Sequence, residues 1–411
     1  MRLRFVILFF ALVTIVNCQS SMAQMILPGP AGSWSVGTTT FPLTDDRRGS
    51  SPDGTESPRV IMVHAWYPAS APGPTRAPYL RDEPAMAGLR KLNPGLAGRL
   101  LVDGVTAHAT VDAPVASIAG GMPVLIFSHG YLALPSDYTA LMEDLASHGY
   151  AIFSITHPYE TAATSIGGGK VALGFGARGL NDVTGAVIKE WHDEDSVSAA
   201  VTGATDRSGA ERTMRDFLSR IPKSAEAVDR WAEDMRVTVD RVTALGARAS
   251  GDRFADKLDL GKLGAFGHSM GGVTSAAYCA RDARCRAAIN LDGSPQYGDL
   301  INKPGNSPFL MIYATRPGRV GVSDLIYGRS DSAWRAVING SLHLNFGDFQ
   351  YRQGPQRLSD ALGTLSADRA TTIVHRLVRE WFDKWLGGRQ APLLDGEQVF
   401  PEVTVSRISR H

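Results

Sequence analysis

Short runs of apolar residues recur along the chain and alternate with stretches in which apolar residues recur every three or four positions. Continuous apolar runs of about four to eight residues are typical of parallel strands that are covered on both faces. The second pattern is typical of helices that bury one face. The alternation predicts an α/β fold with a mostly parallel central sheet and helices on both faces. The predicted strands are Val60–Tyr67, Pro123–Phe127, Tyr150–Ile155, Leu263–Phe266, Ala287–Leu291, Phe309–Tyr313 and Trp334–Ile338.

Four segments carry a clear helical pattern. One helix follows the second predicted strand, with Ser136 as its N-cap and Gly149 as its end. The other predicted helices are residues 228–246, 270–280 and 367–386.

The apolar pattern fades between about residues 160 and 223. Glycines cluster at 167–169 and acidic residues at 193–195. We expect a single domain over residues 24–411, in which residues 160–223 form a cap or lid insertion. The glycine-rich part suggests that this segment is a mobile lid over a pocket for the acyl group of a substrate.

A nucleophile motif stands between a predicted strand and a predicted helix. Gly267–Gly271 reads Gly-His-Ser-Met-Gly and fits G-x-S-x-G. On a sharp strand-to-helix turn such a serine is exposed for reaction, and unpaired N–H groups of the helix N-terminus point toward it. The motif therefore predicts Ser269 as a catalytic nucleophile.

A serine hydroxyl needs a base and an orienting carboxylate, which in this type of site follow in the order Ser, Asp, His. Asp292 comes directly after a predicted strand, and His343 lies in a loop after another. Both therefore stand at the carboxyl ends of strands, where an open parallel sheet places its site. Asp324 is an alternative acid. The alternative bases are His268, which we expect to point away from the site, and His129 and His157, which precede Ser269.

The loop Ser128–Tyr131 follows the second predicted strand. It is the place for a second oxyanion donor in such a site. We expect the oxyanion hole to consist of the backbone N–H groups of Tyr131 and Met270.

Charge and composition exclude several classes of protein. Among 411 residues, Lys and Arg number 42 and Asp and Glu number 41. This balance disfavours a nucleic-acid partner. The hydrophobic share of 44% disfavours a disordered chain. No histidine at ligand spacing accompanies Cys279 and Cys285, which disfavours a zinc site. The predicted serine mechanism requires neither a metal nor an organic cofactor, so we expect neither.

The N-terminus has the three parts of a secretory signal peptide: Arg2 and Arg4, the apolar run 5–16, and Ser21–Ala23. At about 1.5 Å per residue, this run is too short to cross a bilayer core of about 30 Å. We expect cleavage after Ala23 and a secreted or periplasmic protein. Lipidation of Cys18 is an alternative.

Cys279 and Cys285 remain in the mature chain. In an oxidising compartment they can form a disulfide across a short turn. The alternative is a pair of buried thiols.

Six short motifs along the chain match one known family. They are Trp66–Pro68, Phe127–Gly130, Asp144–Tyr150, Gly267–Gly272, Leu291–Asp292 and Gly340–Phe349. Together they resemble the α/β-hydrolases related to platelet-activating factor acetylhydrolase, of the plasma or group VII phospholipase A2 type, over roughly residues 55 to 385.

The resemblance implies an α/β-hydrolase fold with Ser269 as nucleophile, Asp292 as acid and His343 as base. It also places the oxyanion donors at Tyr131 and Met270. Asp292 is favoured over Asp324 because that family draws its acid from the earlier strand. Two departures leave the substrate open: His157–Tyr159 replaces a charged His-Arg-Asp-like run, and residues 160–223 do not align.

The sequence therefore predicts a serine carboxylic ester hydrolase that forms an acyl-enzyme. The expected substrates are short-acyl esters, including platelet-activating-factor-like or oxidised phospholipids, with transient contact to a membrane surface as one mode of access. The alternatives are a serine peptidase of the same fold, a polyester or dienelactone hydrolase and, least favoured, a non-catalytic binding protein.

Overall fold

The structure is a computed structural model. It describes residues 25–49, 51, 58–293, 298–303, 305–316, 318–327, 332–353 and 358–408. The predicted signal peptide at residues 1–23, with Cys18, lies outside the described residues.

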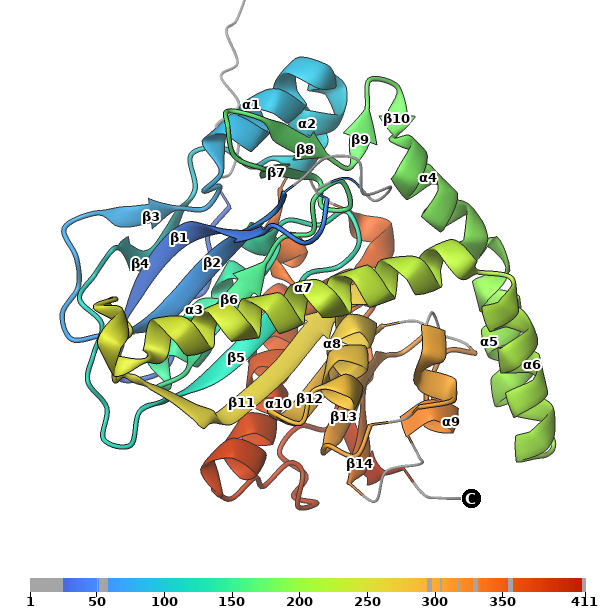
Figure 1. Ribbon diagram of the computed structural model, residues 1–411. Helices are drawn as coiled ribbons and strands as arrows, with labels where there is room; N and C mark the ends of the chain where they lie inside the picture. The colour runs from blue at the N-terminus through green and yellow to red at the C-terminus, as the bar shows by residue number, and fades with distance from the viewer. Residues whose placement is uncertain are drawn as a thin grey trace, which may run out of the picture.

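A twisted central sheet runs through the molecule (Figure 1). Its order in the described part of the chain is β15-β14-β13-β12-β11-β5-β6-β2-β1-β4-β3. The strands from β14 to β6 are parallel to their neighbours, whereas β15 and β2 pair antiparallel at either side. The strands are β1 Ser35–Asp45, β2 Arg59–Ala69, β3 Arg76–Pro78, β4 Thr106–Val111, β5 Met122–Ser128, β6 Ala151–Ile155, β11 Leu258–His268, β12 Cys285–Leu291, β13 Phe309–Ala314, β14 Ala333–Ile338 and β15 Val403–Arg407.

Helices cover both faces of the sheet. On one face lie α7 (Pro222–Gly246) and α8 (Met270–Arg281), and on the other α3 (Thr139–Ser147) and α10 (Ala367–Gly387) (Figure 1). The sandwich of helix, sheet and helix confirms the predicted α/β architecture with a mostly parallel sheet.

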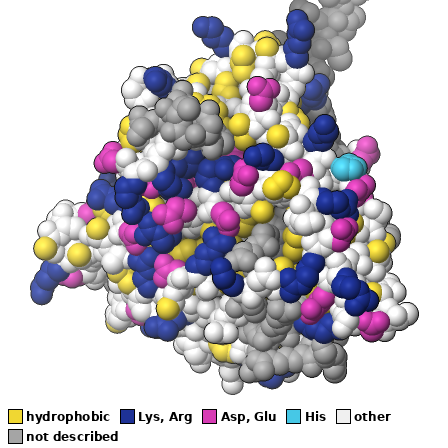
Figure 2. Space-filling model, turned by 45° about the vertical axis from the view of Figure 1, so that its right-hand side comes forward, with side chains coloured by type: hydrophobic (Ala, Val, Ile, Leu, Met, Phe, Trp, Pro, Cys, Tyr) yellow, Lys and Arg dark blue, Asp and Glu magenta, His cyan; other side chains and the backbone are white. Residues whose placement is uncertain are grey.

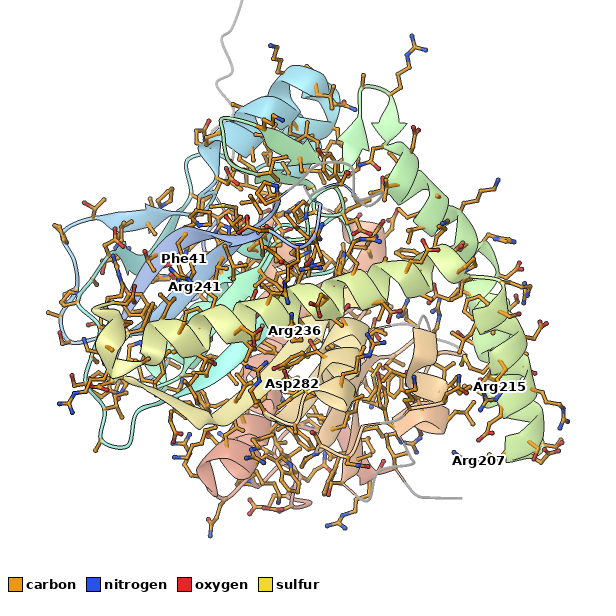
Figure 3. The ribbon with its side chains drawn as sticks, viewed as in Figure 1. Phe41, Arg207, Arg215, Arg236, Arg241 and Asp282 are labelled. Atoms are coloured by element: carbon orange, nitrogen blue, oxygen red, sulfur yellow. A yellow bond between two sulfur atoms is a disulfide. The ribbon has the colours of Figure 1, made fainter. Side chains whose placement is uncertain are left out.

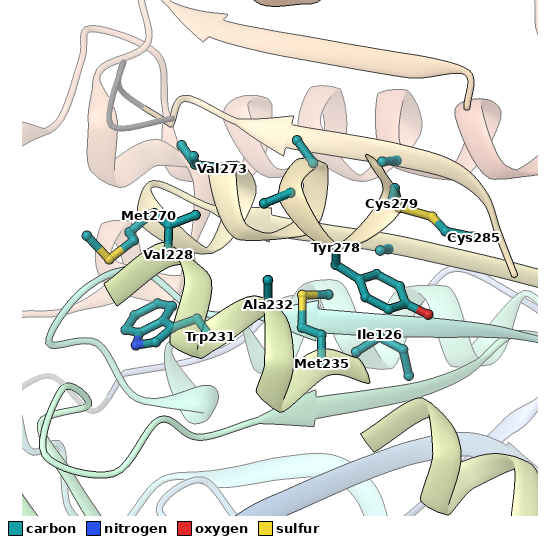
Figure 4. Close-up of a cluster of buried hydrophobic side chains, with 14 of the residues drawn as sticks. Ile126, Val228, Trp231, Ala232, Met235, Met270, Val273, Tyr278, Cys279 and Cys285 are labelled. Atoms are coloured by element: carbon teal, nitrogen blue, oxygen red, sulfur yellow. A yellow bond between two sulfur atoms is a disulfide. The ribbon is translucent and has the colours of Figure 1, made fainter. Parts of the chain in front are cut away.

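Two hydrophobic cores result from these layers. Figure 4 shows the first, which contains Trp231 and Met235 of α7, Val273 and Tyr278 of α8, and Ile126 of β5. In the second, α3 and α10 pack their apolar faces against the opposite side of the same strands. Because both faces of β5 and β11 are buried, these strands carry the continuous apolar runs seen in the sequence.

The segment in which the apolar pattern fades is helical over much of its length. It contains α4 (Asp182–Lys189), α5 (Glu194–Thr202) and α6 (Arg207–Ser219), which lie along one side of the molecule (Figure 1). Figure 3 labels Arg207 and Arg215 on α6. Arg207 Nη2 donates to the Leu325 carbonyl at 3.2 Å, and Arg215 Nη1 donates to Asn302 Oδ1 at 2.5 Å. α6 also buries Ala210, Met214 and Phe217 in the first core, and its apolar signal is weak because polar residues outnumber these three.

The same segment also contains four short strands, and two helices precede it. The strands pair as β7 with β8 and β9 with β10. The bounds of these strands and of the two preceding helices are β7 Ala163–Ser165, β8 Val171–Leu173, β9 Phe175–Gly176, β10 Gly179–Leu180, α1 Glu83–Leu92 and α2 Pro94–Leu100.

One predicted helix start is wrong. Ser136 lies inside a 3-10 turn, η1 (Pro135–Tyr138), and α3 begins at Thr139. The Asp137 side chain accepts from the Leu134 N–H at 2.9 Å, so Asp137 caps this turn in place of Ser136.

Figure 2 shows Lys and Arg side chains interspersed with Asp and Glu over one face of the surface, in line with the balanced charge. Within the described residues, we find no helix with the length and apolar character that a membrane span requires.

Cys279, at the end of α8, and Cys285, at the start of β12, are joined by a disulfide with Cα atoms 5.1 Å apart (Figure 4). The bond closes the turn between the nucleophile helix and the strand that leads to Asp292.

We expect the double substitution of Cys279 and Cys285 by serine to lower the free energy of unfolding by about 2 kcal/mol, because a short loop in the unfolded chain is no longer closed. Urea unfolding of both proteins measures the difference. Adding a reductant should lower the stability of the wild type alone. Equal stability of wild type and variant without reductant would show that the bond contributes nothing.

Candidate active site

Ser269 sits on a sharp turn between β11 and α8. Its backbone has φ 56° and ψ −126°, a strained conformation for a residue with a side chain. The turn needs glycine on both sides, because a Cβ on Gly267 would overlap Gly271, and a Cβ on Gly271 would overlap the Ser128 carbonyl oxygen. The G-x-S-x-G pattern therefore reflects direct backbone contact between the turn and the end of β5.

Asp292 and His343 meet at the ends of different strands. Asp292 directly follows β12, and His343 begins the 3-10 turn η5 (His343–Phe346) after β14. His343 Nδ1 lies 2.7 Å from Asp292 Oδ2, and Asp292 Oδ1 accepts from the Ala314 N–H at 2.9 Å. The carboxylate is thus held so that His343 presents its other ring nitrogen.

A third group, Arg316, completes the surroundings of this carboxylate. Its Nη2 lies 2.8 Å from Asp292 Oδ2, and the side chain of Asp292 is 1% exposed. Burial by itself raises the pKa of Asp292, but the hydrogen bond and charge of His343 and the charge of Arg316 outweigh it and lower that pKa. The sequence analysis missed Arg316, since no motif marks an arginine just beyond β13.

The alternative acid lies elsewhere in the structure. Asp324 starts the short helix α9 (Asp324–Tyr327). Its carboxylate contacts Arg335 Nη1 at 2.6 Å and accepts from the Tyr313 hydroxyl at 3.2 Å. Burial raises its pKa. The structure brings Asp292, and not Asp324, to His343.

The three alternative histidines make other contacts. His268 Nδ1 lies 2.8 Å from the Tyr138 hydroxyl and its Nε2 lies 2.9 Å from the His343 carbonyl. Burial, followed by the charge of His343, lowers the pKa of His268 well below the ordinary value. His268 therefore supports the backbone of the His343 turn. His129 contacts the Gly130 carbonyl, and His157 contacts Ser128 and Asp234.

A pocket of about 150 Å³ opens at Ser269 and His343. Its wall is mostly apolar and is formed by α2, the loop after β5 and the turns around residues 343–358. The lining residues are Leu100, Gly130, Tyr131, Leu132, Ala133, Leu134, Asp137, Tyr138, Ala162, His268, Ser269, His343, Leu344, Phe349, Arg352 and Leu358. Ala162 is thus the one lining residue from the 160–223 segment.

The loop after β5 borders the pocket beside Ser269. The Gly130 N–H donates to the Tyr138 hydroxyl at 3.0 Å, so this group is already used. Among the described residues, neither the Tyr131 N–H nor the Met270 N–H has a hydrogen-bond partner. These two backbone donors, one in the loop that borders the pocket and one directly after Ser269, are the kind of group that can hold an oxyanion.

Among the residues that the structure describes, no three His, Cys, Asp or Glu side chains come together as metal ligands. The chemistry that this arrangement offers is therefore that of a serine, an imidazole, a carboxylate and backbone N–H donors.

We expect Arg316→Gln to lower the free energy of unfolding by about 1–3 kcal/mol at pH 7, because the buried Asp292 loses a charged partner. The lowered pKa of Asp292 contributes stability at pH values above its ordinary value. This contribution disappears as the pH falls through the folded-state pKa, so the difference between the proteins should narrow in acid.

Urea unfolding across this pH range measures the effect. Arg281→Gln is the matched control: it breaks an exposed ion pair with Asp229 and should change stability by less than about 0.5 kcal/mol. An equal loss in both variants would contradict a specific role of Arg316 at Asp292.

Comparisons with known proteins agree with this geometry. The sequence profile of the family described as platelet-activating factor acetylhydrolase, isoform II, matches residues 23–170 and 224–377. Platelet-activating factor acetylhydrolase of Canis lupus familiaris is 22% identical over 416 residues, covering 92% of this chain and 84% of that protein. A probable 1-alkyl-2-acetylglycerophosphocholine esterase of Arthroderma benhamiae is 22% identical over 438 residues, covering 96% of this chain and 97% of that protein.

The fold has a solved relative. A ferulic acid esterase from Streptomyces cinnamoneus superposes with a TM-score of 0.68 and 25% identity, covering 93% of this chain and 99% of the esterase. With the two matched profile segments, this likeness confirms the expected resemblance and fold. The chain belongs to the platelet-activating factor acetylhydrolase family and is a carboxylic ester hydrolase with an α/β-hydrolase fold.

Proposed function

We propose that the protein is a serine esterase that cleaves short-acyl esters through an acyl-enzyme. The observation that carries the proposal is the 2.7 Å contact between His343 Nδ1 and Asp292 Oδ2 at the pocket that Ser269 also lines. A buried carboxylate on Nδ1 sets the tautomer in which Nε2 can accept a proton, as a general base must.

In the proposed first half-reaction, Ser269 Oγ attacks the ester carbonyl carbon while its proton passes to His343 Nε2. The carbonyl oxygen becomes an oxyanion and accepts hydrogen bonds from the Tyr131 and Met270 N–H groups. The tetrahedral intermediate then collapses: the bond to the alcohol oxygen breaks, and His343 returns the proton to the leaving alcohol. Asp292 stabilises the imidazolium throughout.

In the second half-reaction, water replaces the alcohol. His343 takes a proton from the water, whose oxygen attacks the acyl carbon of the Ser269 ester. Collapse of the second intermediate releases the carboxylic acid and returns the proton to Ser269 Oγ.

Pocket size supports short acyl groups. A cavity of about 150 Å³ is large enough for a benzene-sized group. The apolar wall favours an acyl chain over a charged group. Because relatives are named for platelet-activating factor and for 1-alkyl-2-acetylglycerophosphocholine, we include phospholipids with a short or oxidised acyl chain among the proposed substrates.

A hydroxycinnamate ester is the second candidate substrate. The solved relative is a ferulic acid esterase, and the rings of Tyr131, Tyr138 and Phe349 line the pocket here. Polyester and dienelactone substrates, which also belong to the ester class, stay as alternatives for the experiment to separate.

We also propose that residues 160–223 are an insertion in one domain that spans 24–411. The family profile leaves out residues 171–223, which include α4, α5 and α6. Ala162 is the one residue of segment 160–223 that lines the pocket. The segment would therefore influence substrate choice at this part of the pocket wall. That this segment is a mobile lid stays a prediction.

The signal peptide also stays a prediction. With cleavage after Ala23, it would make the protein secreted or periplasmic.

Hydrolysis of p-nitrophenyl esters from acetate to palmitate, with methyl ferulate and a short-chain phospholipid alongside, tests the proposal. We expect acetate and butyrate to be the best substrates and Ser269→Ala to lower kcat by about 10⁶-fold, because the nucleophile is lost. A variant that keeps its activity would show that Ser269 is not the nucleophile, and a wild type that cleaves none of these esters would contradict the proposed substrates.

The acid is tested separately. We expect Asp292→Asn to lower kcat by about 10⁴-fold, because an amide cannot hold the same imidazole tautomer. Asp324→Asn is the matched control, since Asp324 is a half-buried carboxylate that also contacts an arginine, and the kcat of this variant should stay within about threefold of the wild type. The reverse ranking would make Asp324 the acid.

A further inference from the structure

A second Ser-His-Asp chain of hydrogen bonds lies inside the protein. His157 Nδ1 is 2.8 Å from Asp234 Oδ2, and His157 Nε2 is 2.9 Å from Ser128 Oγ. The atoms pair in the same order as in a catalytic triad. All three residues are fully buried, with 0% of their surface exposed, so no substrate can reach them.

Charge compensation sets the direction of these bonds. Arg59 donates to both oxygens of Asp234 at 2.7 Å, and Arg48 Nη2 lies 2.8 Å from Asp234 Oδ1. Burial by itself raises the pKa of Asp234, but the charge and hydrogen bonds of Arg59 and His157 outweigh it and lower that pKa. Burial lowers the pKa of His157. A neutral His157 therefore donates from Nδ1 to Asp234 and accepts a hydrogen bond at Nε2 from the Ser128 hydroxyl.

The ring of His157 is held by Trp231 of α7. The two rings stack with centroids 3.8 Å apart and an interplanar angle of 7°. Trp231 also stacks on Tyr131, with centroids 5.7 Å apart. Its Nε1 donates to Glu160 Oε2 at 2.9 Å, while the backbone carbonyl of Glu160 accepts from the Leu132 N–H at 2.9 Å. Both ends of the loop between Ser128 and Leu132 are thus tied to one buried cluster.

The first residue of that loop also contacts the nucleophile turn. A Cβ on Gly267 or on Gly271 would overlap the Ser128 carbonyl oxygen. Ser128 therefore joins the buried hydrogen-bond chain through its side chain and the Ser269 turn through its backbone. At the other end of the loop, Leu132 has φ 63°, a strained value that neighbouring contacts must hold in place.

We propose that Ser128, His157, Asp234 and Trp231 are positioning residues that fix the Tyr131 N–H relative to Ser269. This inference rests on the proposed function, in which Tyr131 is an oxyanion donor. Such a donor acts only within about 2.7–3.1 Å of the oxyanion, and a misplacement of about 1 Å can cost 10²-fold in rate. An oxyanion donor that is held in place stabilises the transition state and does not strengthen the binding of the ester in the ground state.

Two substitutions remove the hydrogen bond from opposite ends. Ser128→Ala deletes the hydroxyl, and His157→Phe deletes both ring nitrogens while it keeps a ring to stack on Trp231. The matched control is Thr238→Val on α7. The Thr238 hydroxyl is also fully buried and donates to the Asp234 backbone carbonyl at 2.8 Å, one helical turn from the cluster.

The measurements are kcat and KM for p-nitrophenyl butyrate and the inhibition constant of a butyl trifluoromethyl ketone, which forms a tetrahedral adduct on serine. Thermal unfolding identifies the folded variants. We expect both variants to lower kcat by about 10- to 100-fold and to leave KM within about twofold. The inhibition constant of the ketone should rise by the same factor by which kcat falls. Thr238→Val should keep all three values.

A kcat within about twofold of the wild type in the folded variants would overturn the inference, as would an equal loss in Thr238→Val. A fall in kcat with unchanged ketone affinity would also contradict it. Activity that survives in Ser269→Ala would identify a failure of the proposed function itself, and this inference would fall with it.

Discussion

Backbone contact between the Ser269 turn and the end of β5 is the constraint on which the site depends. Gly267 and Gly271 let the Ser128 carbonyl approach the turn so closely that no Cβ fits between them. β5 and β11 are neighbouring parallel strands, so their carboxyl ends reach the same edge of the sheet. The nucleophile turn and the loop with Tyr131 are therefore adjacent before any side chain contributes.

Asp292 and Asp234, two buried carboxylates near this edge, each have a cationic partner. Arg316 contacts Asp292, and Arg59 contacts Asp234. An unpaired charge in the interior would be costly, because the protein cannot replace the water that solvates it. The arginines allow both carboxylates to remain ionised next to a histidine. The two Ser-His-Asp sets thus share one electrostatic design and differ in access: the side chain of His343 is 28% exposed, while that of His157 is fully buried.

Beyond Glu160 and Ala162, the segment 160–223 also contacts the body of the enzyme near the site through Trp191 and α5. Trp191 packs edge-on against Tyr131 with ring centroids 5.4 Å apart. Arg319, three residues beyond Arg316, forms ion pairs with Glu194 and Asp195 of α5. The insertion therefore borders both the loop with Tyr131 and the loop that carries Arg316, although its helices do not line the pocket. Changes in this segment can reach the site through these contacts.

The sequence by itself determined the α/β alternation, the turn at Ser269 and the strand ends that carry Asp292 and His343. These features are local: a strand buried on both faces is continuously apolar, and a tight turn requires glycines at set positions. The sequence did not reveal β1, whose alternation of apolar and polar residues is weak although β1 pairs with β2 over its whole length. It also did not reveal α4 to α6, because polar residues outnumber the short apolar faces of these helices.

Which groups lie around Ser269 and His343 follows from the packing of distant segments and not from the local sequence. The residues themselves left Asp292 and Asp324 open, and the family resemblance alone favoured Asp292. The structure brings Asp292 to His343, and places Arg316 beside that carboxylate. The same holds for His157, whose partners Ser128 and Asp234 lie 29 and 77 residues away along the chain. Hydrogen bonds between distant residues leave no periodic pattern in a single sequence, because their geometry arises only when the strands and α7 pack together.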